Sequence, residues 1–105
     1  MEITIEVSGG FATFPRLNAP VTIDTEKMAE PVADELESAL KKARFFDLPT
    51  SIGEEAPGSA DIMTYTITAK AENLSHTVRI IDPITDPSLQ HLVEQILAIS
   101  HVSRP

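Results

Sequence analysis

The chain has 105 residues, 42% of them hydrophobic, which suits a single domain with one core over residues 1–105. Sixteen acidic and eight basic residues give a net charge of −8, which argues against nucleic acid as a partner because its phosphates are negative. Cysteine is absent, so disulfides and thiolate chemistry are excluded. No apolar run approaches the ~20 residues of a membrane span, and no leader opens the chain, so we expect a cytoplasmic protein with no membrane partner.

Residues 3–7 alternate apolar and polar side chains, the pattern of a half-buried strand. Gly9-Gly10 follows, and paired glycines favour a tight primed turn, so we expect a hairpin. With these glycines as a two-residue loop, Ile5 faces Phe14 and Phe11 is left on the polar face. A loop of odd length would reverse the parity and bury Phe11 instead. The core face of the two-residue hairpin comprises Ile3, Ile5, Val7, Ala12 and Phe14.

Prolines at 15 and 20 place the second arm at a sheet edge, and residues 21–23 resume it briefly. Residues 30–46 predict a helix, since Pro31 suits its first turn with Glu30 as the cap. Its acidic residues come early and its basic residues late, which complements the helix dipole. The expected apolar stripe comprises Val32, Leu36, Ala39, Leu40 and Ala43.

Residues 50–60 are rich in glycine and include the acidic pair Glu54-Glu55, so we expect a long loop that is either a binding loop or a plain linker. Strands follow over 62–69 and 76–81, the second with His76, Val78 and Ile80 on its inner face. A last helix begins with Asp86 as cap and Pro87 in its first turn, and the tail 101–105 is expected to fray. The expected buried face of this helix comprises Leu89, Leu92, Val93, Ile96 and Leu97, with Ile99 as a further candidate. The order β-β-α-β-β-α predicts an α+β fold in which a four-stranded antiparallel sheet carries two helices on one face.

Catalytic and metal-binding motifs are absent from this sequence. It contains no metalloprotease, nucleophile-elbow, phosphate-loop or dinucleotide motif. The histidines at 76, 91 and 101 fall on separate segments, and the carboxylates form no discernible acid–base pair. We therefore expect no enzyme, no catalytic residue, no metal and no cofactor.

The order of several segments resembles the emfourin family: ITIEVSGGFATF at the start, RFFDLP at the end of the first helix, then DIMTYTIT, HTVRIID and a leucine-rich helix. The resemblance covers nearly the whole chain. One departure is Thr13, which stands where a further glycine is expected after SGGFA. The resemblance implies a bacterial protein that inhibits thermolysin-like zinc metallopeptidases, protealysin among them, by occupying the substrate cleft.

For a target of this kind, the glycine hairpin and the acidic loop are the two candidate contact segments of this chain. Thermolysin-like enzymes favour a large apolar side chain after the scissile bond, which makes Phe11 a candidate anchor, with the acidic pair at the rim. The absence of an obvious zinc ligand in the glycine loop suggests that the cleft is blocked without capture of the metal. The alternative is an acidic α/β chaperone or adaptor, which would form dimers, whereas we expect a monomer. The predicted partner-binding residues are Ser8, Gly9, Gly10, Phe11, Thr13, Glu54 and Glu55.

Overall fold

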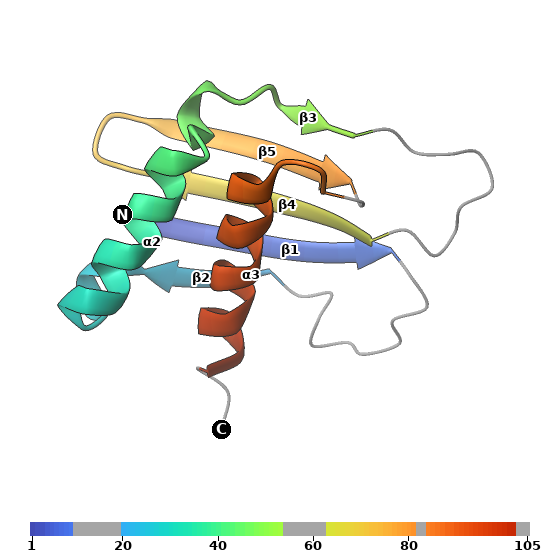
Figure 1. The fold of residues 1–105 in the computed structure, drawn as a ribbon. Coiled ribbons are helices and arrows are strands. Elements are labelled where there is room, and N and C mark those ends of the chain that lie inside the picture. The colour runs from blue at the N-terminus through green and yellow to red at the C-terminus, as the bar shows by residue number, and fades with distance from the viewer. Residues whose placement is uncertain (10–19, 54–62, 82–83, 103–105) are drawn as a thin grey trace.

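The computed structural model describes residues 1–9, 20–53, 63–81 and 84–102, with the backbone alone at 8–9 and 100–102. It has a five-stranded sheet and two α-helices (Figure 1). The strands are β1 (Glu2–Gly9), β2 (Val21–Asp24), β3 (Ser51–Ile52), β4 (Met63–Lys70) and β5 (Ser75–Ile81). The helices are α2 (Glu30–Lys42) and α3 (Pro87–Val102), with short 3-10 helices η1 (Thr25–Lys27) and η2 (Phe45–Asp47).

The sheet has the strand order β2-β1-β4-β5-β3. Its first three pairings are antiparallel, whereas β3 runs parallel to β5 with Ile52 opposite Ile80. The prediction of a four-stranded antiparallel sheet is therefore wrong in two respects: the sheet has a fifth strand, β3, and this strand is parallel to its neighbour. The additional strand is β3, which lies inside the segment predicted as a loop. Directly before it, the Thr50 carbonyl accepts a hydrogen bond from the Arg79 N–H at 2.8 Å.

The predicted two-residue hairpin at Gly9-Gly10 is also wrong. β1 continues through Gly9, because all eight of its residues pair with β4. On its other side β1 pairs with β2, where Ile5 lies opposite Val21 in place of the predicted Phe14. The connection from β1 to β2 therefore comprises residues 10–20, and the predicted positions of Phe11, Ala12 and Phe14 lie outside the described residues.

Both helices cover one face of the sheet, as predicted (Figure 1). The sheet contributes alternate residues to the core, which also includes the fully buried Phe45 from η2. Burying a side chain of this size contributes about 1.5–3 kcal/mol. The predicted inner faces of the strands are confirmed at the buried residues Ile3, Ile5, Val7, Ile67, Ala69, Val78 and Ile80.

The first helix differs from its prediction at both ends. It begins with Ala29 as cap, one residue before the predicted cap Glu30. It ends at Lys42, because Arg44 adopts a left-handed conformation with φ 52° and a short 3-10 turn follows. The stripe is confirmed except at Val32, which is 39% exposed, while its neighbour Ala33 is buried.

The second helix confirms the predicted cap. The Ser88 N–H donates to the Asp86 carboxylate at 2.9 Å, and the helix begins at Pro87. It continues to Val102, so the predicted fraying from residue 101 is wrong for 101 and 102. Its buried face comprises Leu89, Leu92, Val93 and Ile96, as predicted, whereas the predicted Leu97 and Ile99 are half-buried.

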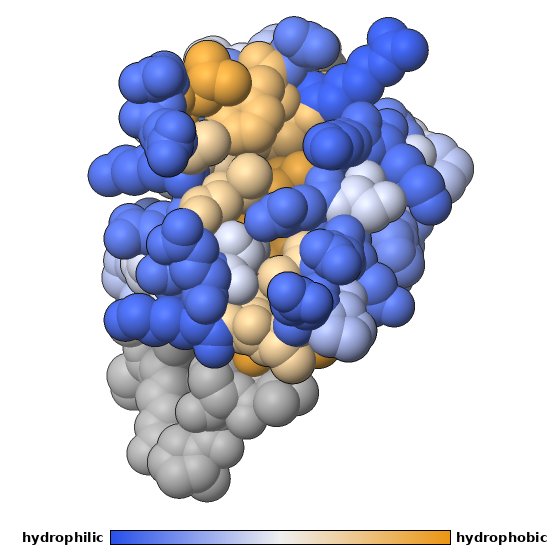
Figure 2. All heavy atoms as spheres, turned by 90° about the vertical axis from the view of Figure 1, so that its left-hand side faces the viewer, coloured by the Kyte–Doolittle hydropathy of each residue, from blue (hydrophilic) through white to orange (hydrophobic). Residues whose placement is uncertain are grey.

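The side of the molecule that lies at the left in Figure 1 exposes only a narrow apolar band. Figure 2 shows an apolar band bordered closely on both sides by hydrophilic side chains. Among the described residues, the large apolar side chains that stand exposed are Val32 and Leu74, the latter in the turn between β4 and β5. No helix within the described ranges is long and apolar enough to cross a bilayer.

Candidate functional site

The segments that carry the predicted contact residues leave the same end of the sheet. Gly9, the last residue of β1, lies opposite Met63, the first residue of β4. β5 ends beside them at Ile81, which lies opposite Thr64. β3 ends beside β5, so Gly53 comes next to Ile81, and all four strand ends lie at the right in Figure 1. Residues 10, 54 and 62 are therefore attached to one end of the fold, which we call the Gly9–Met63 end.

Gly53 holds the start of the acidic segment close to β5. Its φ of +94° is in a region that other residues rarely adopt. A Cβ at this position would lie 2.8 Å from the Ile81 carbonyl oxygen and 3.1 Å from the Ile81 Cβ. Only glycine fits this approach without a shift of the backbone. From the sequence, this glycine was predicted only as part of the loop from 50 to 60. Its close approach to Ile81 was missed.

The core reaches the outer side of the sheet at this end. Thr64 and Ile81 lie opposite each other in the ladder, and their neighbours Tyr65 and Ile80 face the helices, so this pair belongs to the opposite face. Both are nonetheless buried, at 6% and 3% exposure. The predicted open, polar face of the sheet is therefore closed here. Farther along, that face is polar, and Thr4 is hydrogen-bonded to Thr22, as Thr68 is to Thr77, at 2.9 Å each.

The polar groups of the described residues serve structure more than chemistry. His76 Nε2 donates to the Leu48 carbonyl at 2.7 Å, and its ring lies edge-on to Phe45 with centroids 5.7 Å apart. His91 is exposed on α3. Within the described ranges, no group of three or more histidine and acidic side chains is placed to hold a metal ion.

Only part of the predicted contact set is described. Ser8 and Gly9 are the last two residues of β1, and Gly9 belongs to the strand instead of the predicted turn. The remaining predicted residues, which are Gly10, Phe11, Thr13, Glu54 and Glu55, lie outside the described residues. Their contacts stay predictions. The structure does show that the segments containing them begin at one place on the fold.

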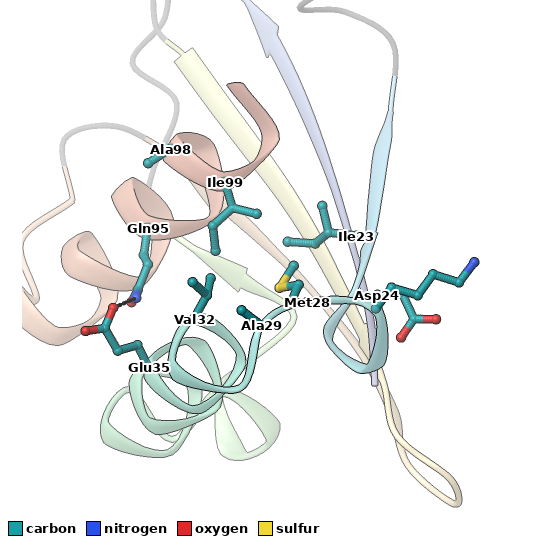
Figure 3. A pocket seen from close by; sticks show the side chains of 10 residues that line it. Ile23, Asp24, Met28, Ala29, Val32, Glu35, Gln95, Ala98 and Ile99 are labelled. Carbon is teal, nitrogen blue, oxygen red and sulfur yellow. Dashed lines mark hydrogen bonds between the residues drawn. The ribbon is translucent and has the colours of Figure 1, made fainter. Parts of the chain in front are cut away.

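A concave surface separate from the Gly9–Met63 end lies at the edge of the sheet, between η1, the first turns of α2 and the second half of α3 (Figure 3). This groove has a volume of about 600 Å³ and an apolar lining, and sequence analysis gave no sign of it. The residue that could have indicated it is Val32, which was assigned to the buried stripe but lies at the groove. The lining residues are Ile23, Asp24, Lys27, Met28, Ala29, Val32, Glu35, Gln95, Ala98 and Ile99.

The family model described as Emfourin matches residues 5–97, a span that includes all or part of every helix and strand given above. The chain belongs to the emfourin family. This confirms the resemblance seen in the order of its segments. Emfourins are peptidase inhibitors and not enzymes, which also favours inhibition over the chaperone or adaptor alternative.

Comparison with individual proteins adds one distant relative. The solved structure of emfourin from Serratia proteamaculans, described as an M4 family peptidase inhibitor, is 22% identical. The match covers 89% of this chain and 82% of that one, with a TM-score of 0.36. No curated protein matches the chain.

Proposed function

We propose that this protein inhibits thermolysin-like zinc metallopeptidases of the protealysin type, as a monomer that occupies the substrate cleft. The observation that carries the proposal is the family match, which extends from β1 to α3. The contact is made by the segments that leave the Gly9–Met63 end. These segments contain Phe11 as the apolar anchor and Glu54 and Glu55 as charges at the rim.

A rigid base for both segments supports this proposal. β1 and β4 pair at eight successive positions from Glu2 opposite Lys70 to Gly9 opposite Met63, and β5 continues the sheet beside them. An inhibitor loses affinity for every residue that becomes ordered on binding, and a fixed base reduces that loss. The sheet end therefore holds the residues to which both segments are attached close together, which suits an inhibitor that enters a cleft through them.

The corrected hairpin changes how the two segments compare. A two-residue turn would cost less conformational entropy on docking than the loop from 50 to 60, since ordering one residue costs about 1–2 kcal/mol. The connections are in fact 10–20 and 53–62, which are similar in length. Entropy therefore does not favour the first segment. The preference for Phe11 rests on the chemistry of its large apolar side chain alone.

Inhibition through the zinc ion is not required by this proposal. Among the described residues no metal-binding cluster is present, and the segment from 8 to 14 contains no histidine, cysteine or carboxylate. We therefore infer that the protein blocks the cleft without removing the metal. This distinguishes the proposal from chelation by an acidic protein, which would depend on zinc concentration.

The test is a progress-curve assay with purified thermolysin and an internally quenched peptide substrate. We expect competitive inhibition at near-stoichiometric amounts of the protein and none of trypsin. Excess zinc should leave the inhibition unchanged. Inhibition that disappears with added zinc, or that extends to trypsin, would contradict cleft blocking. Light scattering measures the mass of the free protein and of the complex, and we expect one copy of the inhibitor in each.

A further inference from the structure

We infer that the groove beside β2 is a docking site for an extended peptide segment of a partner protein, in which aliphatic side chains alternate with lysine or arginine. The segment adds as a strand to the outer edge of β2, which has no strand beside it among the described residues. Its aliphatic side chains enter the groove, and its basic side chains lie on the opposite face of the sheet beside Asp24 and Glu2. This site is separate from the Gly9–Met63 end and does not depend on the proposed inhibition.

The backbone at this edge is oriented for strand addition. β2 is the outermost strand of the sheet next to β1. The Thr25 N–H donates to the Met1 carbonyl at 2.9 Å, which makes residues 1 and 25 a hydrogen-bonded pair in the register that continues Glu2 opposite Asp24. Hydrogen-bonded pairs alternate along an antiparallel ladder, so the N–H and C=O groups of Thr22 and the N–H of Asp24 point away from β1. The Asp24 carbonyl belongs to η1, since Asp24 is the N-cap of that turn. Strand addition binds a peptide through outward-pointing groups of this kind.

The groove lies on the side of this edge that faces the helices. Ile23, on the helix-facing side of β2, forms one wall with Met28 next to it, and Val32 of α2 and Ile99 of α3 lie opposite (Figure 3). An added strand directs every second side chain to this face of the sheet. The groove therefore receives alternate residues of the peptide, and its apolar lining selects aliphatic ones.

Charge on the opposite face of the sheet selects the remaining residues, because the side chains between the aliphatic ones point there. Asp24 lies on that face opposite Glu2, since both alternate with the buried, helix-facing Ile3 and Ile23. A peptide with basic residues between its aliphatic ones is complementary to these two carboxylates. A second copy of the chain is disfavoured, because pairing two β2 edges would bring like charges together in a protein of net charge −8.

The groove is far enough from the other end of the fold for both to be occupied together. Asp24 lies opposite Glu2, at the end of β1 remote from Gly9. The seven residue steps between Glu2 and Gly9 span about 23 Å at about 3.3 Å per residue. A peptide in the groove should therefore leave peptidase inhibition unchanged.

The probe is a seven-residue synthetic peptide of alternating lysine and leucine with a neutral fluorophore, titrated with the protein by fluorescence anisotropy. We expect binding that weakens with salt, and none with glutamate in place of lysine. Val32→Lys should weaken binding by about tenfold or more, because it removes an apolar contact worth about 1.5 kcal/mol or more. Leu74→Lys is the matched control, since it also replaces an exposed apolar side chain with a charge but lies in the distant β4–β5 turn, and it should bind normally.

Backbone pairing is tested with two further peptides, one N-methylated at every leucine and one at every lysine. Only alternate amides of an added strand face β2, so one of these peptides should lose binding and the other keep it. Equal binding by both, or equal loss, would overturn strand addition. No binding of the parent peptide, or a dimer of the protein that Val32→Lys dissociates in sedimentation experiments, would overturn the proposed occupant.

Discussion

Gly9 at the end of β1 lies directly opposite Met63 at the start of β4, and this pair closes the antiparallel ladder between the two strands. Two segments far apart in the sequence therefore meet at one place on the fold. One begins after Gly9 and contains Phe11, and the other ends before Met63 and contains Glu54. The proposed inhibitory surface depends on this pairing.

Gly53→Ala should destabilise the protein by about 1–3 kcal/mol, the usual cost of holding a residue other than glycine in such a backbone conformation. The added Cβ also meets the Ile81 carbonyl oxygen at 2.8 Å. Urea unfolding followed by circular dichroism measures the change. Ser51→Ala, at an exposed position two residues earlier, is the control and should stay within about 0.5 kcal/mol of the parent. Equal stability of the two variants would mean that the close approach to Ile81 is absent.

Arg44→Gly should stabilise the protein by about 0.5–1 kcal/mol. Arg44 has a φ of 52°, a conformation that costs most residues about 1–2 kcal/mol and that glycine adopts freely. Lys41→Gly removes the same charge from the last turn of α2 and should instead destabilise by about 1 kcal/mol. Thermal unfolding of the two variants should therefore shift in opposite directions. A loss of stability with Arg44→Gly would contradict the described end of this helix.

Leu36→Ala should destabilise by about 2–5 kcal/mol, because Leu36 is fully buried between the sheet and the helices. Val32→Ala is the comparison on the same helix. Val32 is 39% exposed, so its truncation should cost less than about 1 kcal/mol. Chemical unfolding of both variants gives the two values. Similar losses would mean that the helix is rotated from the orientation described.

The sequence predicted those parts of the fold that depend on neighbouring residues. The apolar periodicity of α3 and the Asp86 cap are local, and both were confirmed. The paired glycines also gave a local signal for a turn, but β1 continues through Gly9 because β4 pairs with it from more than fifty residues away. β3 was missed for a similar reason, since two residues show no periodicity and their partner is distant. Pairing between distant segments decides such cases.

The candidate site was predicted unevenly for the same reason. The two segments were singled out because their glycines indicated turns or loops, but nothing in their composition showed that they are attached to the same end of the sheet. The groove was missed because it is formed by Ile23, Val32 and Ile99, which come from separate elements. Val32 fitted the helical spacing of the core, and the exposed position emerged only from how α2 lies against α3.

Phe11→Ala should accelerate dissociation from a thermolysin-like peptidase by about tenfold or more, since apolar anchors of this kind contribute about 2 kcal/mol or more. Glu54→Lys should instead change mainly the association rate at low salt, as expected for a charge at the rim. Surface plasmon resonance separates the two rates. Leu74→Ala, at the opposite end of β4, serves as the control and should leave both rates unchanged. Normal dissociation of Phe11→Ala would mean that this side chain is not the anchor.

Isotope-edited NMR of the complex with an active thermolysin-like peptidase tests the central claim most directly. The backbone amides of Ser8, Gly9, Gly53 and Met63 should shift or broaden on binding, whereas those from Lys70 to Ser75 should stay unchanged. This result would place the peptidase at the Gly9–Met63 end. Shifts confined to the β4–β5 turn or to the groove beside β2, with the Gly9–Met63 end unaffected, would contradict the account.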